Sequence, residues 1–417
     1  MLKLFRVNNF KSLVNCEFRP VGLNLLIGPN NAGKTNLCSA MRFLGLTSSY
    51  PLEEALRMAG GETWNVTNVY VNDPTVTMEV ECELDCEKEV GKGTKTRDGF
   101  ATEGAVEPDK ERLAFSYRLV VKVSQETPAG RRSLSVVEES LTATGSGFMN
   151  TPLLTNMNGN VALLHEQRFL QKQPSPAVAT SAPTDATMLY RLFDLTTNRR
   201  SNIFKRYMQS WSYYSLNPAD LRSSKVVKET PGLLSDGGNL IRALYTLHMQ
   251  NPRLEKNLIE AVRTLEPKLE FFTFQSPDPD SVFLFMEDKE RHRFGTQGIS
   301  DGTLRFMAIT YLLGVAADAD GAGPRGLTII EEPENGLYVG HLKPIFKGID
   351  AQGKAGQYIL TSHNPYFIDL FDGHLEGVHL VKAGKPSSEI RKPNIEKVRK
   401  LLDEYALGEL YFREMLL

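Results

Sequence analysis

A glycine-rich stretch near the N-terminus constrains this chain of 417 residues more than any other feature. Residues 28–35 read GPNNAGKT, which is the complete G-x-x-x-x-G-K-T spacing of a phosphate-binding loop. The loop follows an apolar run, Leu23–Ile27, that predicts a buried strand, and it precedes residues 36–44, whose pattern predicts a helix. An ordinary glycine turn before a helix would not need the complete spacing and both flanking elements. We therefore expect the loop to bind the phosphates of a nucleotide.

The chemistry of this loop comes from its backbone and from two side chains. Glycines let backbone N–H groups close around phosphate oxygens because no Cβ is in the way, and the helix N-terminus adds partial positive charge. Lys34 is expected to reach the outer phosphates, and the Thr35 hydroxyl is expected to ligate Mg²⁺. The nucleotide-binding residues predicted here are Gly28, Asn30, Asn31, Ala32, Gly33, Lys34, Thr35 and Asn36.

An acidic pair, Glu331 and Glu332, directly follows the apolar run Leu327–Ile330. A phosphate-binding loop works with an acidic Mg²⁺ partner at the end of a neighbouring strand. If the strand continues through both residues, their side chains point to opposite faces. One carboxylate would then hold Mg²⁺, directly or through water, and the other would polarise the attacking water. The alternative is a solvated strand end, which the buried run and the upstream loop make the weaker interpretation.

Two further polar sites lie where a phosphate could be contacted. His363 follows the buried run Gln357–Thr361 and could donate a hydrogen bond to a γ-phosphate, although a histidine at a strand end is more often structural. Ser300 and Gly302 lie at the start of a predicted helix, where the hydroxyl, the backbone N–H groups and the helix dipole favour an anion. A capped helix is the simpler alternative. Two phosphate-binding elements with one loop favour a two-fold dimer in which each Ser300 turn completes the other subunit's site.

These motifs, together with Asn9–Ser12, resemble the ABC-type ATPase heads of the RecF/SMC/OLD group. The resemblance is strongest to the stand-alone bacterial AAA family ATPases of that group, and it covers both ends of the chain well but residues 90–185 poorly. It implies an α/β fold, namely a P-loop NTPase head of the ABC type with an N-terminal antiparallel β subdomain and a helical insertion. It also implies ATP and Mg²⁺ as cofactors.

The resemblance assigns a role to each motif. It implies that the Walker A pair is Lys34 and Thr35, and that the Walker B acid, which binds Mg²⁺ together with Thr35, is Glu331. It also implies that Glu332 is the catalytic glutamate and His363 the switch histidine. The signature contains Ser300 and Gly302. The chain departs from the pattern in reading SDG rather than SGG at the signature and Glu rather than Asp at Walker B. Tyr338-Val339 replaces the usual His-Pro after the D-loop, Asn335–Leu337. No Q-loop glutamine can be assigned, and Gln167 and Gln125 are weak candidates.

The pattern along the chain indicates four segments. We expect the N-terminal half of the head in residues 1–90, an antiparallel β extension with flexible loops in 91–185, a helical insertion in 186–268 and the C-terminal half of the head in 269–417. Within them, residues 66–84 alternate like a strand pair, 87–112 read as a mobile loop and 172–187 as a linker or exposed loop rich in Pro, Ser and Ala.

Composition narrows the class of protein. The chain has 48 Lys and Arg against 50 Asp and Glu, a net charge of −2, which argues against a globally basic nucleic-acid binder. No signal peptide and no bilayer-spanning run is visible, so we expect a cytoplasmic protein without a membrane partner. The cysteines lack a second Cys or His pair and are expected as reduced thiols, namely Cys16, Cys38, Cys82 and Cys86.

We therefore expect an Mg-ATP-binding and hydrolysing switch that closes as a head-to-head homodimer or a higher homo-oligomer. No long coiled coil, Toprim domain or other nuclease motif is visible, so we expect the effector to be a separate protein. The group includes ATPase subunits of bacterial anti-phage systems such as Septu and PARIS, which act beside a separate nuclease or toxin. The resemblance implies the same kind of partner here.

Two alternatives stay open. The first is an ATP-gated scaffold or sensor with little turnover, which would not need the water-activating acid Glu332. The second is a RecF-like DNA-repair ATPase that binds duplex DNA. Its only signal is a set of scattered basic residues that more often form a solvated surface, namely Arg131, Arg132, Arg199, Arg200, Lys205 and Arg206.

Overall fold

The computed structural model describes residues 1–87, 110–124, 132–145, 148–172, 177–193, 197–223, 232–278, 280–318, 326–353 and 356–417. The chain divides into two compact units, residues 1–19 with 43–210 and residues 20–42 with 211–417. The chain passes from the second unit back to the first within helix α1 (Lys34–Leu46), between Arg42 and Phe43. In the described part of the chain, no helix combines the length and the apolarity that a membrane crossing requires.

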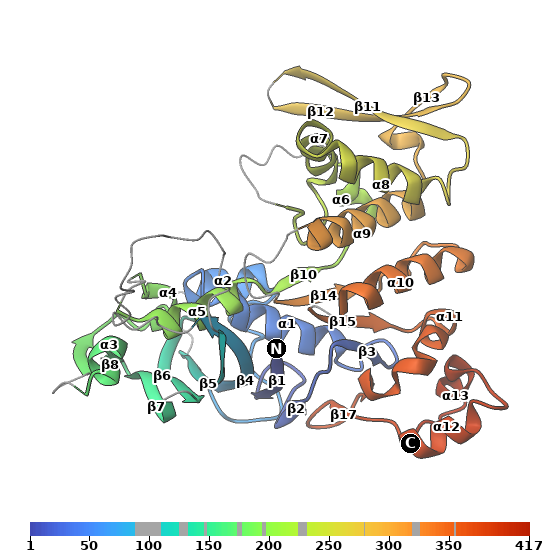
Figure 1. Cartoon of the computed structure of the whole chain (residues 1–417). Helices are drawn as coiled ribbons and strands as arrows, with labels where there is room; N and C mark the ends of the chain where they lie inside the picture. The colour runs from blue at the N-terminus through green and yellow to red at the C-terminus, as the bar shows by residue number, and fades with distance from the viewer. Residues whose placement is uncertain are drawn as a thin grey trace, which may run out of the picture. The chain divides into compact units, whose positions relative to one another are not determined.

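The first unit is built on an antiparallel sheet with eight strands among the described residues, in the order β2-β1-β4-β5-β6-β7-β8-β9 (Figure 1). Alternate residues of β4 from Val76 to Cys86 are buried, which explains the period-two pattern seen in the sequence. The strands are β1 (Leu2–Asn8), β2 (Cys16–Phe18), β4 (Thr75–Glu87), β5 (Lys110–Val123), β6 (Leu134–Gly145), β7 (Phe148–Met157), β8 (Asn160–Leu164) and β9 (Ala177–Ser181). The helices are α2 (Leu52–Met58), α3 (Glu166–Leu170), α4 (Met188–Arg191) and α5 (Arg199–Gln209).

The structure corrects two expectations in this unit. Residues 66–84 are not a strand pair, because the strand begins only at Thr75 and Val69 is 85% exposed. Asn68 holds the preceding segment as a loop, since its backbone N–H donates to Asn9 Oδ1 and its side chain donates to the Lys11 carbonyl. The expected linker contains β9, which pairs with β8. The expected mobile loop lies mostly outside the described residues, at 88–109.

The second unit is built on a sheet in the order β10-β14-β15-β3-β16-β17, parallel except for its last pair. Its strands are β3 (Leu23–Ile27), β10 (Ser212–Tyr214), β14 (Leu327–Glu331), β15 (Gln357–Ser362), β16 (Val378–Lys382) and β17 (Glu389–Arg391). All residues of β3 and β15 are buried, as the apolar runs predicted. In the register of the central strands, Ile27 pairs with Ser362 and Glu331 with Thr361, so the polar residues that follow these strands meet at one edge of the sheet.

Helices and a small sheet complete this unit. Helices α7 and α8 lie against the antiparallel strands β11 and β12, and α8 packs on α9 (Figure 1). The strands are β11 (Leu269–Asp278), β12 (Ser281–Asp288) and β13 (Arg293–Gly295). The helices are α6 (Pro218–Leu221), α7 (Leu240–Gln250), α8 (Pro252–Val262), α9 (Asp301–Asp318), α10 (Leu342–Gly353), α11 (Pro365–Ile368), α12 (Ile395–Leu401) and α13 (Leu407–Phe412), with 3₁₀ turns at Thr296–Gly298, Val339–His341 and Asp369–Gly377.

The stretch 186–268 differs from a purely helical insertion. Its helices α7 and α8 confirm the sequence pattern, and Asn251 caps α8 by accepting a hydrogen bond from the Leu254 N–H. The stretch also contains β10, which extends the parallel sheet by pairing with β14.

Candidate nucleotide site

The glycine loop takes a closed conformation between β3 and α1. Gly33 has φ 109°, which L side chains rarely adopt, and a Cβ on Gly28 would lie 2.2 Å from the Val381 carbonyl oxygen. Lys34 is buried, and its ammonium group donates to the carbonyl oxygens of Gly28 at 2.6 Å and Pro29 at 3.1 Å. Burial lowers the pKa of Lys34, and Glu332 and Glu331 oppose that shift. The loop thus surrounds a cation whose carbonyl partners a phosphate could replace.

Glu331 ends β14 beside this loop. The side chains of Tyr213, Thr35 and Cys38 lie within hydrogen-bonding reach of its carboxylate, and burial raises its pKa. The oxygen Oε1 is buried and has no hydrogen-bond partner among the described residues. A buried carboxylate oxygen without a partner is stabilised by a cation, and hydroxyl and carboxylate oxygens are ligands that suit Mg²⁺. Thr35 and Glu331, the two predicted metal ligands, therefore lie together and fit such an ion.

Glu332 leaves the strand direction at once. Its backbone has φ 45°, and its N–H donates to the Thr361 carbonyl oxygen at 3.1 Å. Its carboxylate accepts from Asn335 Nδ2 at 2.8 Å and lies 3.1 Å from His363 Nδ1. The side chains of Glu332 and His363 stay 32% and 48% exposed, so water can reach both. The two carboxylates thus differ in direction because of a left-handed residue, and not because a strand persists.

Glu334 belongs to the same edge, although the sequence analysis did not select it. The residue is 3% exposed, and the Ser362 hydroxyl donates to its Oε1. Ser362 Oγ in turn accepts the Asn364 N–H at 3.0 Å, so Glu334 anchors the turn that carries His363. Burial raises the pKa of Glu334. Its position directly after Pro333 in an acidic stretch was the available signal.

The signature turn begins α9. Ser300 is exposed and its Oγ accepts the Thr303 N–H at 3.1 Å, which is the contact of a helix cap. A Cβ on Gly302 would lie 2.5 Å from the Gly336 carbonyl oxygen, so the signature turn packs closely on the D-loop of the same chain. Arg305 donates to the Asn335 carbonyl and strengthens this contact.

Among the described residues, neither Q-loop candidate is found on the parallel sheet. Gln167 belongs to α3 in the other unit, and Gln125 lies outside the described residues. The strand beside Glu331 is β10, and the residues that follow it are Ser215, Leu216 and Asn217. Asn217 Oδ1 caps α6 by accepting the Ala219 N–H at 3.1 Å. The turn that follows the strand beside Glu331 thus contains no glutamine.

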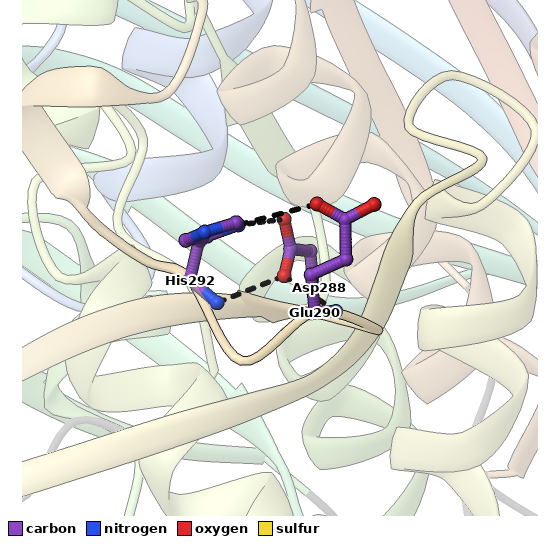
Figure 2. A group of neighbouring side chains, drawn as sticks. All are labelled: Asp288, Glu290 and His292. Carbon is purple, nitrogen blue, oxygen red and sulfur yellow. Dashed lines mark hydrogen bonds and ion pairs between the residues drawn. The ribbon is translucent and has the colours of Figure 1, made fainter.

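Other polar clusters have structural partners. Asp288, Glu290 and His292 lie within 4.8 Å of one another (Figure 2), but Asp288 accepts the N–H groups of the other two and closes the turn between β12 and β13. All four cysteines are described, and they are buried and form no disulfide bond. Burial raises the pKa of Cys86 to about 11, which keeps it a thiol.

The basic residues considered for DNA are partly used inside the first unit. Arg200 is buried and pairs with Glu111 at 3.0 Å and Glu166 at 3.6 Å. Lys205 donates to the carbonyl oxygens of Tyr190 and Leu192, both at 2.8 Å. Arg131 lies outside the described residues. These contacts weaken the case for a phosphate-binding surface made of the six residues.

Comparison with known proteins agrees with this geometry. Residues 189–369 match the family described as "AAA domain, putative AbiEii toxin, Type IV TA system". The chain is 24% identical over 304 residues to the DNA replication and repair protein RecF of Symbiobacterium thermophilum, which covers 71% of this chain and 74% of RecF. The fold is similar to that of an Smc head bound to the C-winged helix domain of ScpA, with a TM-score of 0.52 at 13% identity over 96% of this chain and 99% of the Smc head.

Proposed function

We propose that this chain, which is similar to RecF and to an Smc head, is an ABC-type ATPase head that binds and hydrolyses Mg-ATP as a molecular switch. One observation carries the proposal. The phosphate-loop residues Lys34 and Thr35 and the acids Glu331 and Glu332 converge at one edge of a parallel sheet, and Glu331 keeps a buried oxygen without a partner among the described residues. A fold-stabilising role alone would favour a neutral side chain at such a position.

The residues divide the work of hydrolysis. Lys34 and the loop N–H groups bind the phosphates, and Thr35 with Glu331 holds the metal ion. Mg²⁺, when bound, supplies charge neutralisation for the phosphates. Glu332 accepts a proton from the attacking water, while Asn335 and His363 fix the direction of its carboxylate. His363 is also exposed enough to donate a hydrogen bond to the terminal phosphate.

The switch is proposed to close as a head-to-head homodimer. Ser300 stands exposed at the N-terminus of α9, an 18-residue helix, and that end favours an anion. In a two-fold dimer this turn would contact the nucleotide of the partner subunit. The close packing of Gly302 on Gly336 would then link the turn to the D-loop of its own chain.

The biological role proposed is control of a separate nuclease or toxin in cytoplasmic anti-phage defence. The match to a family whose description names a toxin–antitoxin system supports a partnership of this kind. Affinity purification of the tagged protein from native cells, with phage challenge of a deletion strain, tests it. Recovery of a nuclease-like or toxin-like partner and a change in phage sensitivity are expected. The role is contradicted if a strain that expresses the protein yields no such partner and the deletion leaves phage sensitivity unchanged.

The ATPase proposal has a direct test in phosphate release. We expect Mg-dependent turnover in the wild type and none in Lys34→Ala. Binding of Mg-ATP without turnover would instead support the scaffold alternative. The RecF relative motivates a test of DNA binding. The affinity of a head that binds duplex DNA should fall steeply as the salt concentration rises. Absence of DNA binding at low salt would remove that alternative.

A further inference from the structure

Tyr213 contacts the metal acid, although no motif marks it in the sequence. Its hydroxyl lies within hydrogen-bonding reach of the Glu331 carboxylate. The strand that carries it, β10, pairs in parallel with β14, and Tyr213 lies opposite Ile329. Because side chains alternate along a strand, Tyr213, Ile329 and Glu331 point to the same face of the sheet.

Helix α1 presents one stripe of side chains to this group. Lys34, Cys38 and Arg42 are four residues apart and therefore share a face of the helix. Cys38 lies within reach of the Glu331 carboxylate, and the Arg42 guanidinium lies 4.4 Å from the centroid of the Tyr213 ring. Lys34, Glu331 and Tyr213 thus belong to one group of neighbouring side chains.

Arg42 restrains the tyrosine ring. Besides stacking on the ring, its Nη2 donates to Ser235 Oγ at 2.8 Å. The segment that contains Ser235 is itself tied to the end of β10, because the Ser235 carbonyl accepts the Ser215 N–H at 2.8 Å. The phenol group therefore has little freedom to rotate away from Glu331.

We propose that Tyr213 is a positioning residue for the metal site, and this inference rests on the proposed function. Its hydroxyl donates to the Glu331 carboxylate and fixes its rotation, which leaves the partner-free Oε1 available to a divalent cation beside Thr35. Groups that orient a metal-binding carboxylate typically change metal affinity by about 10–100-fold when they are removed. Tyr213 should thus set the Mg²⁺ requirement of the protein and leave its phosphate contacts unchanged.

Tyr213→Phe tests this inference, with Tyr214→Phe as the matched control. Tyr214 lies on the same strand but packs against the apolar core on the other face, and its hydroxyl contacts Ser212. Binding of a fluorescent ADP analogue is titrated with Mg²⁺, and Mn²⁺ binding in the presence of ADP is followed by electron paramagnetic resonance. Thermal unfolding without nucleotide reports the fold of each variant.

We expect Tyr213→Phe to raise the half-saturating Mg²⁺ and Mn²⁺ concentrations about 10-fold or more. Nucleotide binding without metal should stay unchanged, and Tyr214→Phe should keep the wild-type metal dependence. Arg42→Lys, which loses the planar stacking group, should shift the requirement in the same direction by a smaller factor. A wild-type metal dependence in folded Tyr213→Phe would overturn the inference alone. A wild type without any metal-dependent nucleotide binding would overturn the proposed function and this inference together.

Discussion

Replacement of Glu332 by glutamine separates ATP binding from hydrolysis. The glutamine oxygen can keep the hydrogen bond from Asn335 Nδ2, now 2.8 Å from Glu332 Oε2. The glutamine amide can donate to His363 Nδ1, whose distance to Oε1 is 3.1 Å, when that nitrogen carries no proton. Both contacts can therefore survive in a side chain of the same shape. The left-handed backbone at φ 45° is also unchanged.

The size of the expected effect follows from what the amide cannot do. An amide does not accept a proton from water, and loss of a general base typically lowers turnover about 10²–10⁴-fold. Such a loss corresponds to about 2.7–5.4 kcal/mol in the activation free energy. Affinity for ATP should stay within about threefold of the wild type, since the phosphate-binding groups are untouched. Alanine would be a poorer test, because it would delete both hydrogen bonds as well.

The assay pairs phosphate release with equilibrium binding of a fluorescent ATP analogue. Glu409→Gln serves as control, because it makes the same chemical change at an exposed helix residue that pairs with Arg413. Turnover in Glu332→Gln equal to that of the control would refute the role of Glu332 as the base. Loss of ATP binding along with turnover would show that the side chain acts in binding and not in the chemical step.

Three further predictions concern residues of the proposed nucleotide site. Lys34→Ala should weaken ATP binding at least about 10-fold, and unchanged affinity in the binding assay would contradict the loop assignment. Ser300→Arg should leave ATP binding to one subunit intact but block closure, and normal turnover by this variant would contradict a site shared by two subunits. Glu331→Gln should raise the Tm of the nucleotide-free protein at pH 7.5 by about 2–4 °C for each kcal/mol gained and remove the Mg²⁺ response. The sign follows because burial raises the pKa of Glu331 in the folded protein above 4.5. The stability of the wild type should therefore decline as pH rises from 4.5 through the folded pKa. A flat pH profile of wild-type stability, equal to that of the variant, would contradict this.

Local sequence patterns predicted the elements that hold the site. Leu23–Ile27 and Gln357–Ser362 are buried on both faces of a parallel sheet, so their apolar runs need no partner information to be recognised. Helix α9 begins at Asp301, as the polar glycine turn indicated. The RecF relative and the Smc head fold agree with the RecF/SMC part of the resemblance read from the spaced motifs, and the anti-phage subgroup stays a prediction.

Long-range pairing explains what the sequence analysis missed. Strand β10 has three residues inside a largely helical stretch, and it exists because it pairs with β14 far along the chain. Residues 66–71 alternate like a strand but form a loop, because Asn68 is bound by Asn9 and Lys11. Tyr213 belongs to no spaced motif, so only the fold brings it to the site, and the one signal for Glu334 was its position after Pro333 in an acidic stretch.

The most direct test of a site completed by two subunits is the solution mass of Glu332→Gln, measured by light scattering with Mg-ATP, with Mg-ADP and without nucleotide. The account predicts that the solution mass rises by one subunit with Mg-ATP but not with Mg-ADP or without nucleotide. Ser300→Arg in the same background should abolish this rise. An equal mass in all three states would contradict closure of the switch by ATP-driven dimerisation.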